Sequence, residues 1–201
     1  MLKRAFDIMT SFIGLIILSP VLLFVFLIIK VFMGGTVFFI QERTGKYGKP
    51  FKIIKFRTMR PNHGGNTLTI QGESRITPLG SIIRKYKLDE LPELLNVLKG
   101  DMSLVGPRPD MPEYMERLVG EEREILEIRP GITCPASIKY SNEESLLANA
   151  DDSQKYYELF IWPDKVKLNL EYCRNRSFFG DIILILKTLF GKHKNNFPKI
   201  E

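Results

Sequence analysis

An uncharged apolar run near the N-terminus constrains this chain more than any other feature of its sequence. Residues 12–29 read FIGLIILSPVLLFVFLII, and the pair Ser19-Pro20 interrupts the run near its middle. As a helix rising about 1.5 Å per residue, the run spans roughly 27 Å, just short of the roughly 30 Å hydrocarbon core of a bilayer. A surface helix of a soluble protein would carry a polar face, which this run lacks. We therefore expect residues 12–29 to enter a membrane.

The flanks of the run indicate how it sits in the membrane. Basic residues precede it, and a longer basic series that begins with Lys30 follows it. Flanks rich in Lys and Arg stay in the cytoplasm, so both ends are expected on that side. Pro20 has no amide hydrogen to donate within a helix. The sequence thus favours a re-entrant membrane helix over residues 1–35, broken at Ser19-Pro20; a spanning helix with a proline kink is the alternative.

The positive charge lies beside this run. Residues 1–60 carry ten Lys or Arg and two Asp or Glu, within a chain of net charge +6. Nucleic acid or an anionic membrane surface would attract such a segment. The apolar run has no use in nucleic-acid binding, so anionic membrane lipids are the expected partner and nucleic acid is not. A mean hydropathy of −0.05 excludes a protein built mainly of spanning helices.

Cysteine usage indicates a domain that faces the cytosol. Cys134 and Cys173 are too few for a disulfide scaffold and are expected to be reduced thiols. A cleaved signal peptide is the alternative for the N-terminus. It is not favoured, because Asp7 interrupts the basic region and no small-residue cleavage site precedes Lys30.

The rest of the chain predicts an α-rich α+β domain with short strands. Apolar patterning and Gly/Pro punctuation place a catalytic domain at residues 36–191, a polar loop at 61–75 and a flexible tail at 192–201. The predicted strands are 37–40 and 51–54, and the predicted helices are 77–87, 89–99, 112–127 and 178–190. The last of these is amphipathic, so it is either a core helix or one lying on the membrane surface.

Asp89 and Glu90 form the sharpest candidate for chemistry. They precede Pro92, which a helix tolerates in its first turn, so the pair is expected at a helix N-terminus with Asp89 as the cap. Neighbouring residues of a helix point in different directions, so the two carboxylates cannot share one task. Taken alone, the dipeptide favours helix capping over catalysis.

Basic residues elsewhere in the chain favour catalysis. Guanidinium and ammonium groups bind phosphate, and Mg²⁺ binds through one or two carboxylates together with phosphate oxygens. Carboxylates with several such cations therefore indicate a metal-held polyphosphate. The candidate phosphate-binding residues are Lys55, Arg57, Arg84, Arg108 and Arg129.

Three segments together identify a family resemblance. QERTGKYGKPFKIIKFRTM at 41–59, KLDELPELLNVLKGDMSLVGPRP at 87–109 and RPGIT at 129–133 resemble the bacterial sugar transferases, the monotopic phosphoglycosyl transferases. The N-terminal KRAFDI and the segment RNRSFFGDIILILKTL near the C-terminus are similar to that family too. The likeness covers nearly the whole chain and matches the small form of these enzymes.

The resemblance implies an activity. Such enzymes enter the bacterial cytoplasmic membrane from its cytoplasmic face by a re-entrant helix broken at Ser-Pro. They transfer a phosphosugar from a UDP-sugar to undecaprenyl phosphate and release UMP, the first step of glycoconjugate assembly. By the same resemblance, Asp89 is the nucleophile that becomes covalently linked to the phosphosugar. Mg²⁺ is held by Asp89 and Glu90, and Arg108 and Arg129 neutralise phosphates.

The chain departs from the family pattern after residue 133. The motif RPGIT continues as CPASIKYSNEE, without the glycine and the Gly-Arg pair that many members have. The departing segment, residues 134–165, leaves the donor sugar open. Two alternative functions are kept: a membrane glycosyl transferase that releases UDP, and a non-catalytic membrane scaffold. A homodimer is also left open, although no heptad pattern indicates one.

Overall fold

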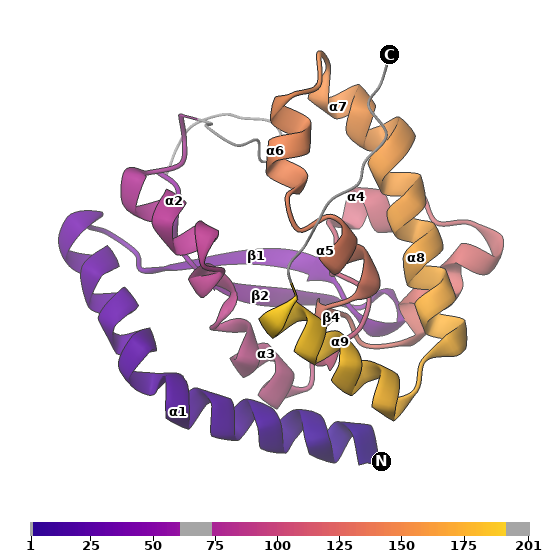
Figure 1. The fold of residues 1–201 in the computed structure, drawn as a ribbon, viewed down its shortest axis with the longest axis horizontal. Helices are drawn as coiled ribbons and strands as arrows, with labels where there is room; N and C mark the ends of the chain where they lie inside the picture. The colour runs from indigo at the N-terminus through magenta and orange to yellow at the C-terminus, as the bar shows by residue number, and fades with distance from the viewer. Residues whose placement is uncertain (1, 61–73, 192–201) are drawn as a thin grey trace.

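A computed structural model describes residues 2–60 and 74–191 of the chain, and within them it is rich in helix with two small sheets (Figure 1). The predicted flexible tail and most of the predicted polar loop lie outside the described residues. The α-helices are α1 Leu2–Phe32, α2 Pro78–Lys85, α3 Glu93–Lys99, α4 Pro112–Met115, α5 Pro135–Lys139, α6 Glu143–Ala148, α7 Ser153–Tyr156, α8 Trp162–Asn175 and α9 Phe178–Phe190. The strands are β1 Phe38–Thr44, β2 Pro50–Phe56, β3 Ser103–Val105 and β4 Gly131–Thr133. Tighter turns are η1 Lys46–Gly48, η2 Leu88–Glu90 and η3 Gly120–Glu127, and η4 Tyr157–Ile161 is a π-helical turn.

Helix α1 carries the apolar run as one bent helix. It continues through Ser19 and Pro20, so the predicted break is corrected to a bend near the middle of the helix (Figure 1). The Ser19 hydroxyl donates to the Ile16 carbonyl at 2.8 Å, and this is the carbonyl that the missing Pro20 amide would have served. The serine therefore satisfies the acceptor that the proline leaves free, and the helix bends without opening.

Most of the α1 surface is not covered by protein. Within the described residues α1 is the helix long and apolar enough to cross a membrane, and only 11% of its apolar window is buried. An apolar surface of this extent needs a non-aqueous neighbour. The helix therefore indicates membrane association, and its re-entrant course stays a prediction.

Replacing Pro20 by leucine is expected to straighten α1. Leucine restores the backbone donor and removes the ring that crowds the preceding turn. Spin labels at Met9 and Val31, both exposed, should then move apart toward the roughly 33 Å of a straight helix over that length. Val21→Leu is the control, because the proline, its bend and the Ser19 hydrogen bond stay in place. An unchanged distance in Pro20→Leu would show that packing against the domain, and not the proline, bends the helix.

The N-terminal half of α1 is held to the domain by buried polar contacts. Arg4 donates to the Val97 carbonyl at 2.7 Å and the Leu98 carbonyl at 3.1 Å, near the C-terminus of α3. Asp7 is 2% exposed and accepts from the Ser103 hydroxyl of β3 at 2.8 Å. These contacts fix the membrane helix against the two elements that follow Asp89-Glu90 in the chain.

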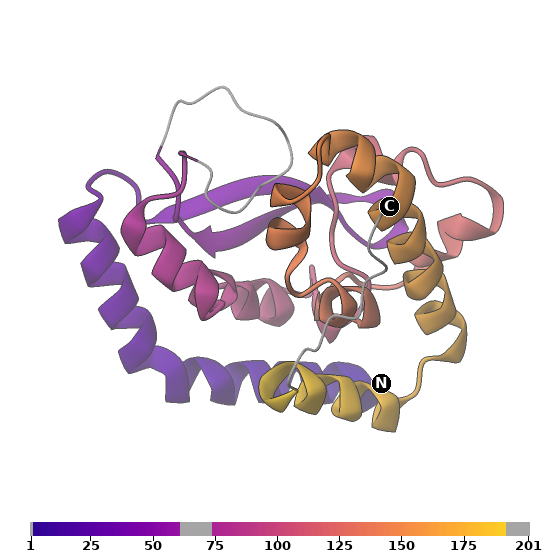
Figure 2. The same ribbon diagram turned by 45° about the horizontal axis from the view of Figure 1, so that its top comes forward.

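Helix α9 lies beside the same half of α1 (Figure 2). Asp181 is buried and pairs with Lys3 at 2.5 Å, and the Tyr172 hydroxyl donates to Asp181 at 2.7 Å. The opposite face is apolar and exposed at Phe179 and Ile183, and at further residues of the same face. The predicted amphipathic helix is therefore confirmed, and its place on a membrane surface stays a prediction.

The two sheets bring the family motifs together. The predicted strands are confirmed as the antiparallel pair β1–β2, in which Phe38 is opposite Phe56. The parallel pair β3–β4 was not predicted, because each strand has three residues and shows no usable alternation. A Cβ on Gly131 would lie 2.1 Å from the Gly106 amide nitrogen, so the RPGIT and GPRP segments touch through backbone alone.

Two predicted helices are corrected. The helix expected at 112–127 is instead the short α4 followed by the 3₁₀ segment η3, which begins at Gly120 with a φ of +53°. The helix expected at 89–99 starts as α3 only at Glu93, with Pro92 in the capping position. Asp89 is therefore not a helix cap; it lies in the preceding turn η2. Lys87 has a left-handed backbone, with a φ of +55°, and this separates the turn from α2.

Candidate active site

Asp89 is buried and carries a free oxygen. It is 7% exposed, and its Oδ1 atom has no hydrogen-bond partner within the described part of the chain. The left-handed turn at Lys87 and the following Pro92 place Asp89 between α2 and α3 instead of on either helix. A buried carboxylate oxygen without a partner is costly. It is therefore a candidate for contact with a substrate or a metal ion.

Glu90, by contrast, is held by two cations. Lys55 Nζ lies 2.9 Å from Glu90 Oε1, and Arg108 Nη2 lies 2.6 Å from the same oxygen. The Glu90 side chain is 13% exposed. Lys55 reaches it from β2, and Arg108 comes from the loop that follows β3. The two neighbouring carboxylates therefore have opposite surroundings.

Lys55 joins a second carboxylate to this cluster. Its Nζ also lies 3.1 Å from Oε1 of Glu93, whose side chain is 3% exposed. Glu93 is three residues after Glu90, so one helical turn brings both acids to the same lysine. Glu93 was not predicted as a site residue, although its i+3 spacing from Glu90 was a usable signal.

The pKa values of the acids follow these contacts. Burial and the charge of Glu90 raise the pKa of Asp89. Burial would also raise the pKa of Glu90, but Arg108 and Lys55 outweigh it and hold that pKa well below its usual range. Burial raises the pKa of Glu93. Neighbouring carboxylates whose pKa values are shifted in opposite directions are typical of sites in which each performs a different task.

Arg84 lies on α2, the helix that packs against the turn η2 of Asp89. Its charge lowers the pKa of Asp89, against the effects of burial and Glu90. Arg84 Nη1 donates to the Thr58 hydroxyl at 3.4 Å, and Nη2 pairs with Glu144 of α6. Three of the five predicted phosphate-binding residues, Lys55, Arg84 and Arg108, are thus brought to the acidic pair.

The other two predicted phosphate-binding residues, Arg57 and Arg129, contact backbone carbonyls instead of the acidic pair. Arg57 Nη2 donates to the Met33 carbonyl at 3.2 Å and also to that of Gly34, so it caps the C-terminal end of α1. Arg129 Nε donates to the Gly100 carbonyl at 2.8 Å, at the far end of α3 from Glu90. Their roles in phosphate binding stay predictions.

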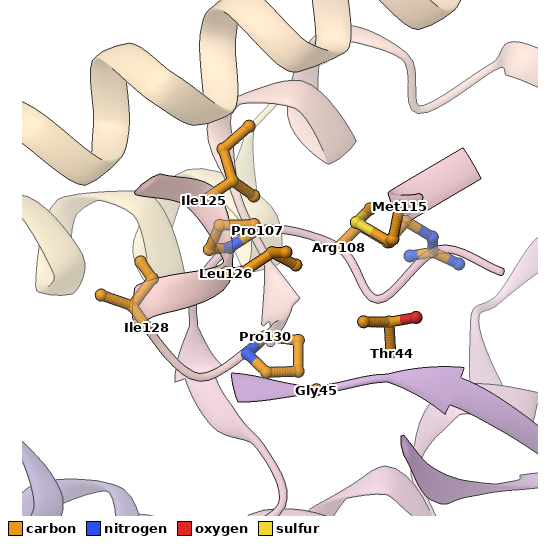
Figure 3. A pocket seen from close by; sticks show the side chains of 9 residues that line it. All are labelled: Thr44, Gly45, Pro107, Arg108, Met115, Ile125, Leu126, Ile128 and Pro130. Atoms are coloured by element: carbon orange, nitrogen blue, oxygen red, sulfur yellow. The ribbon is translucent and has the colours of Figure 1, made fainter. Parts of the chain in front are cut away.

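Arg108 also lines a pocket (Figure 3). Most of its lining is apolar, and Figure 3 shows the Arg108 guanidinium turned away from Ile125 and Leu126. The backbone of Arg108 is fixed between Pro107 and Pro109. This arrangement directs the guanidinium toward Glu90 and leaves the pocket apolar. The lining residues are Thr44, Gly45, Pro107, Arg108, Met115, Ile125, Leu126, Ile128 and Pro130.

The site fits magnesium through Asp89 better than through Glu90. No three His, Cys, Asp or Glu side chains of residues 2–60 and 74–191 gather as a metal cluster. The Oδ1 atom of Asp89, which accepts no hydrogen bond from the described residues, offers one ligand, and Mg²⁺ is commonly held by one or two carboxylates with phosphates and waters. Glu90 Oε1 is already occupied by two cations.

A further group of charged residues, which was not predicted, includes Asp110, two positions after Arg108. Burial raises the pKa of Asp110, which lies among charges that include Lys165 and Glu143. Lys165 is 6% exposed and pairs with Glu143. Lys165 and Glu143 lie in the segment after residue 133, where the family pattern ends, so the resemblance offered no guide to them.

Comparison with known proteins identifies the family. The family model for bacterial sugar transferases matches residues 1–194. The "Uncharacterized sugar transferase EpsL" of Bacillus subtilis is 38% identical over 188 residues, which cover 94% of this chain and 85% of that protein.

Two larger relatives carry names that state a reaction. UDP-glucose:undecaprenyl-phosphate glucose-1-phosphate transferase of Escherichia coli is 36% identical, over 94% of this chain and 40% of its own length. UDP-N-acetylgalactosamine-undecaprenyl-phosphate N-acetylgalactosaminephosphotransferase of Aeromonas hydrophila is 35% identical, over 94% of this chain and 43% of its own length. The match to the family model across nearly the whole sequence confirms the resemblance seen in the motifs, and the chain belongs to the bacterial sugar transferase family.

Proposed function

We propose that this enzyme transfers a phosphosugar from a UDP-sugar to undecaprenyl phosphate and releases UMP. Relatives matched over 94% of the chain are named for transfer of a sugar phosphate to undecaprenyl phosphate. The observation that carries the proposal for this chain is the contrast between its two neighbouring acids. Asp89 has a buried oxygen that no other described residue hydrogen-bonds, and Glu90 pairs with Lys55 and Arg108.

The contrast supports a two-step reaction. In the first step, a carboxylate oxygen of Asp89 attacks the phosphorus that bears the sugar, and the bond from this phosphorus to the bridging oxygen breaks to release UMP. In the second, an oxygen of undecaprenyl phosphate attacks the same phosphorus and the acyl phosphate bond breaks. The product is undecaprenyl diphosphosugar, and Asp89 is regenerated as a carboxylate. Division into two displacements lets one nucleophile serve two bulky anions in turn.

The remaining side chains hold charge and position. Glu90 keeps Lys55 and Arg108 beside Asp89, so it acts as a positioning residue in this proposal. Asp89 would hold Mg²⁺ together with donor phosphates, and the ion supplies neutralisation of phosphate charge. In this proposal Arg84, on the helix that packs against the turn of Asp89, binds a donor phosphate.

The membrane-facing elements fit a lipid acceptor. Helix α1 exposes an apolar surface, and its N-terminal half is fixed to α3 through Arg4 and to β3 through Asp7. The active-site turn η2 lies just before α3 in the chain, so contacts to α3 set its distance from the membrane helix. We propose that the site faces the cytoplasm and that the basic N-terminal region binds anionic lipids, which would strengthen docking at low salt.

Measurement of the released nucleotide tests the proposal. The protein in nanodiscs receives Mg²⁺, undecaprenyl phosphate and one UDP-sugar at a time, and UMP and UDP are quantified separately. We expect UMP from one donor or a few, lost on addition of EDTA. UDP as the product would show that the enzyme transfers the sugar without its phosphate. Neither nucleotide from any UDP-sugar would contradict the proposal and favour a scaffold role.

A further inference from the structure

Glu144 connects α6, among the later helices of the chain, to α2. It lies on α6, and its carboxylate pairs with Nη2 of Arg84 on α2, 60 positions away in the chain. Figure 1 shows α6 among the later helices α5, α7 and α8, apart from α2. The Glu144–Arg84 pair is therefore a tertiary contact between an element of the family-like core and the segment that departs from the family pattern.

Arg84 is incompletely satisfied in this arrangement. Its Nε atom is buried without a hydrogen-bond partner among residues 2–60 and 74–191, and its contact with the Thr58 hydroxyl is long, at 3.4 Å. It lies five positions before Asp89, on the helix that packs against the turn η2. A guanidinium favours bidentate contacts with phosphate, which one carboxylate oxygen does not reproduce. Arg84 thus has unused capacity for an anion beside the proposed nucleophile.

Of the carboxylates that pair with the predicted phosphate-binding residues, Glu144, the partner of Arg84, is the more exposed. Lys55 and Arg108 are paired with Glu90, which is 13% exposed, and Arg57 and Arg129 donate to backbone carbonyls. The Glu144 side chain is 37% exposed. A partly exposed ion pair is weak, because water solvates both groups well once they separate. Among these cations, the one that exchanges its partner for a phosphate most readily is therefore Arg84.

We propose that Glu144 competes with substrate phosphate for Arg84, so that it sets the affinity of the site for the donor and for the UMP product. In the empty enzyme Glu144 holds Arg84; a bound phosphate takes its place, and re-formation of the pair displaces UMP. The inference rests on the proposed function for the identity of the phosphate. The competition itself needs only an anion site at Arg84.

Binding of UMP to a charge-neutral variant tests this competition. Glu144→Gln in the full chain, in nanodiscs with Mg²⁺, is titrated with UMP by isothermal calorimetry. We expect the dissociation constant to fall about threefold to tenfold, as for loss of one weak competing ion pair. Glu158→Gln is the matched control: it removes the same charge from a partner of Arg117, at an exposed ion pair. Its affinity for UMP is expected to equal that of the wild type.

A double variant shows whether Arg84 carries the effect. If Glu144 acts by competition, Glu144→Gln adds nothing to binding once Arg84→Met is present. An equal gain in both backgrounds, or no gain or weaker binding in Glu144→Gln alone, would overturn the proposal. Glu144→Asp serves if the glutamine variant unfolds, because the shorter side chain loosens the pair while it keeps the charge, and tighter binding is again expected.

Inorganic pyrophosphate separates this inference from the proposed function. If the protein is not a UDP-sugar enzyme, UMP will not bind, but pyrophosphate should still bind more tightly to Glu144→Gln than to the wild type. Tighter pyrophosphate binding without UMP binding would uphold the competition and contradict the proposed donor. Failure of both probes to bind either protein would overturn the competition as well.

Discussion

Asp89→Asn is expected to lower UMP release by at least about a thousandfold, because the amide cannot form the covalent phosphosugar intermediate. The substitution keeps the shape of the side chain and removes its charge. Since Asp89 Oδ1 makes no hydrogen bond within the described residues, the fold loses no contact there. The expected loss is therefore in chemistry, with the melting temperature close to that of the wild type.

The measurement has two parts and one control. Initial rates of UMP release are compared with and without undecaprenyl phosphate, and acid-quenched protein is examined by intact mass for a phosphosugar adduct. The adduct should appear on the wild type when the acceptor is omitted and be missing from Asp89→Asn. Asp151→Asn makes the same chemical change at an exposed residue between α6 and α7, and should react as the wild type does. Full turnover by Asp89→Asn would rule out the covalent route.

Patterns that repeat locally were readable from the sequence. The apolar run predicted α1, two apolar stretches around the Gly45/Gly48 turn predicted β1 and β2, and helical spacing predicted α9 with its apolar face. Each of these depends on residues within one element, so a local pattern is enough to predict it. The bend of α1 needed one further step, because Ser19 supplies the hydrogen bond that Pro20 cannot and so keeps the helix continuous.

The arrangement of the site was less predictable for a physical reason. The pair Asp89-Glu90 was visible, but which acid would be clamped depends on Lys55 and Arg108, which are 35 and 18 positions from Glu90. Long-range contacts of this kind leave no local periodic signal. The same holds for Arg84 and Glu144, and for Arg57 and Arg129, whose guanidinium groups meet backbone carbonyls. Family motifs indicated which residues matter, and the fold decides which of them touch.

The largest effect on stability is expected at Lys55. Its side chain is 18% exposed, and its ammonium lies between the carboxylates of Glu90 and Glu93, both largely buried. Burial lowers the pKa of Lys55, but the two glutamates outweigh this and raise it, so the lysine is charged throughout the working range. Removal of one member of a buried ion cluster is costly, because the opposite charges stay behind without compensation.

Lys55→Met is therefore expected to destabilise the protein by about 2–4 kcal/mol, which lowers its melting temperature by roughly 5–12 °C. Lys52→Met is the matched control on the same strand, since Lys52 is exposed, and it should shift the melting temperature by less than about 2 °C. Both are measured in one detergent at one protein concentration. An equal, small shift in the two variants would show that water screens the cluster and that the clamp on Glu90 contributes little to stability.

A second substitution distinguishes an unpaired charge from lost packing. In Lys55→Met, the Glu93 carboxylate has no cation within 4 Å among the described residues, whereas Glu90 keeps Arg108 at 2.6 Å. Adding Glu93→Gln removes this uncompensated carboxylate. The double variant is therefore expected to recover part of the lost melting temperature, because a neutral amide is cheaper to bury than an uncompensated carboxylate. No recovery would mean that the lysine stem, through its packing, supplies the stability. Lys55→Met would lose stability with Asp89 intact, whereas Asp89→Asn would lose chemistry with the fold intact, so the two variants separate what holds the site from what reacts in it.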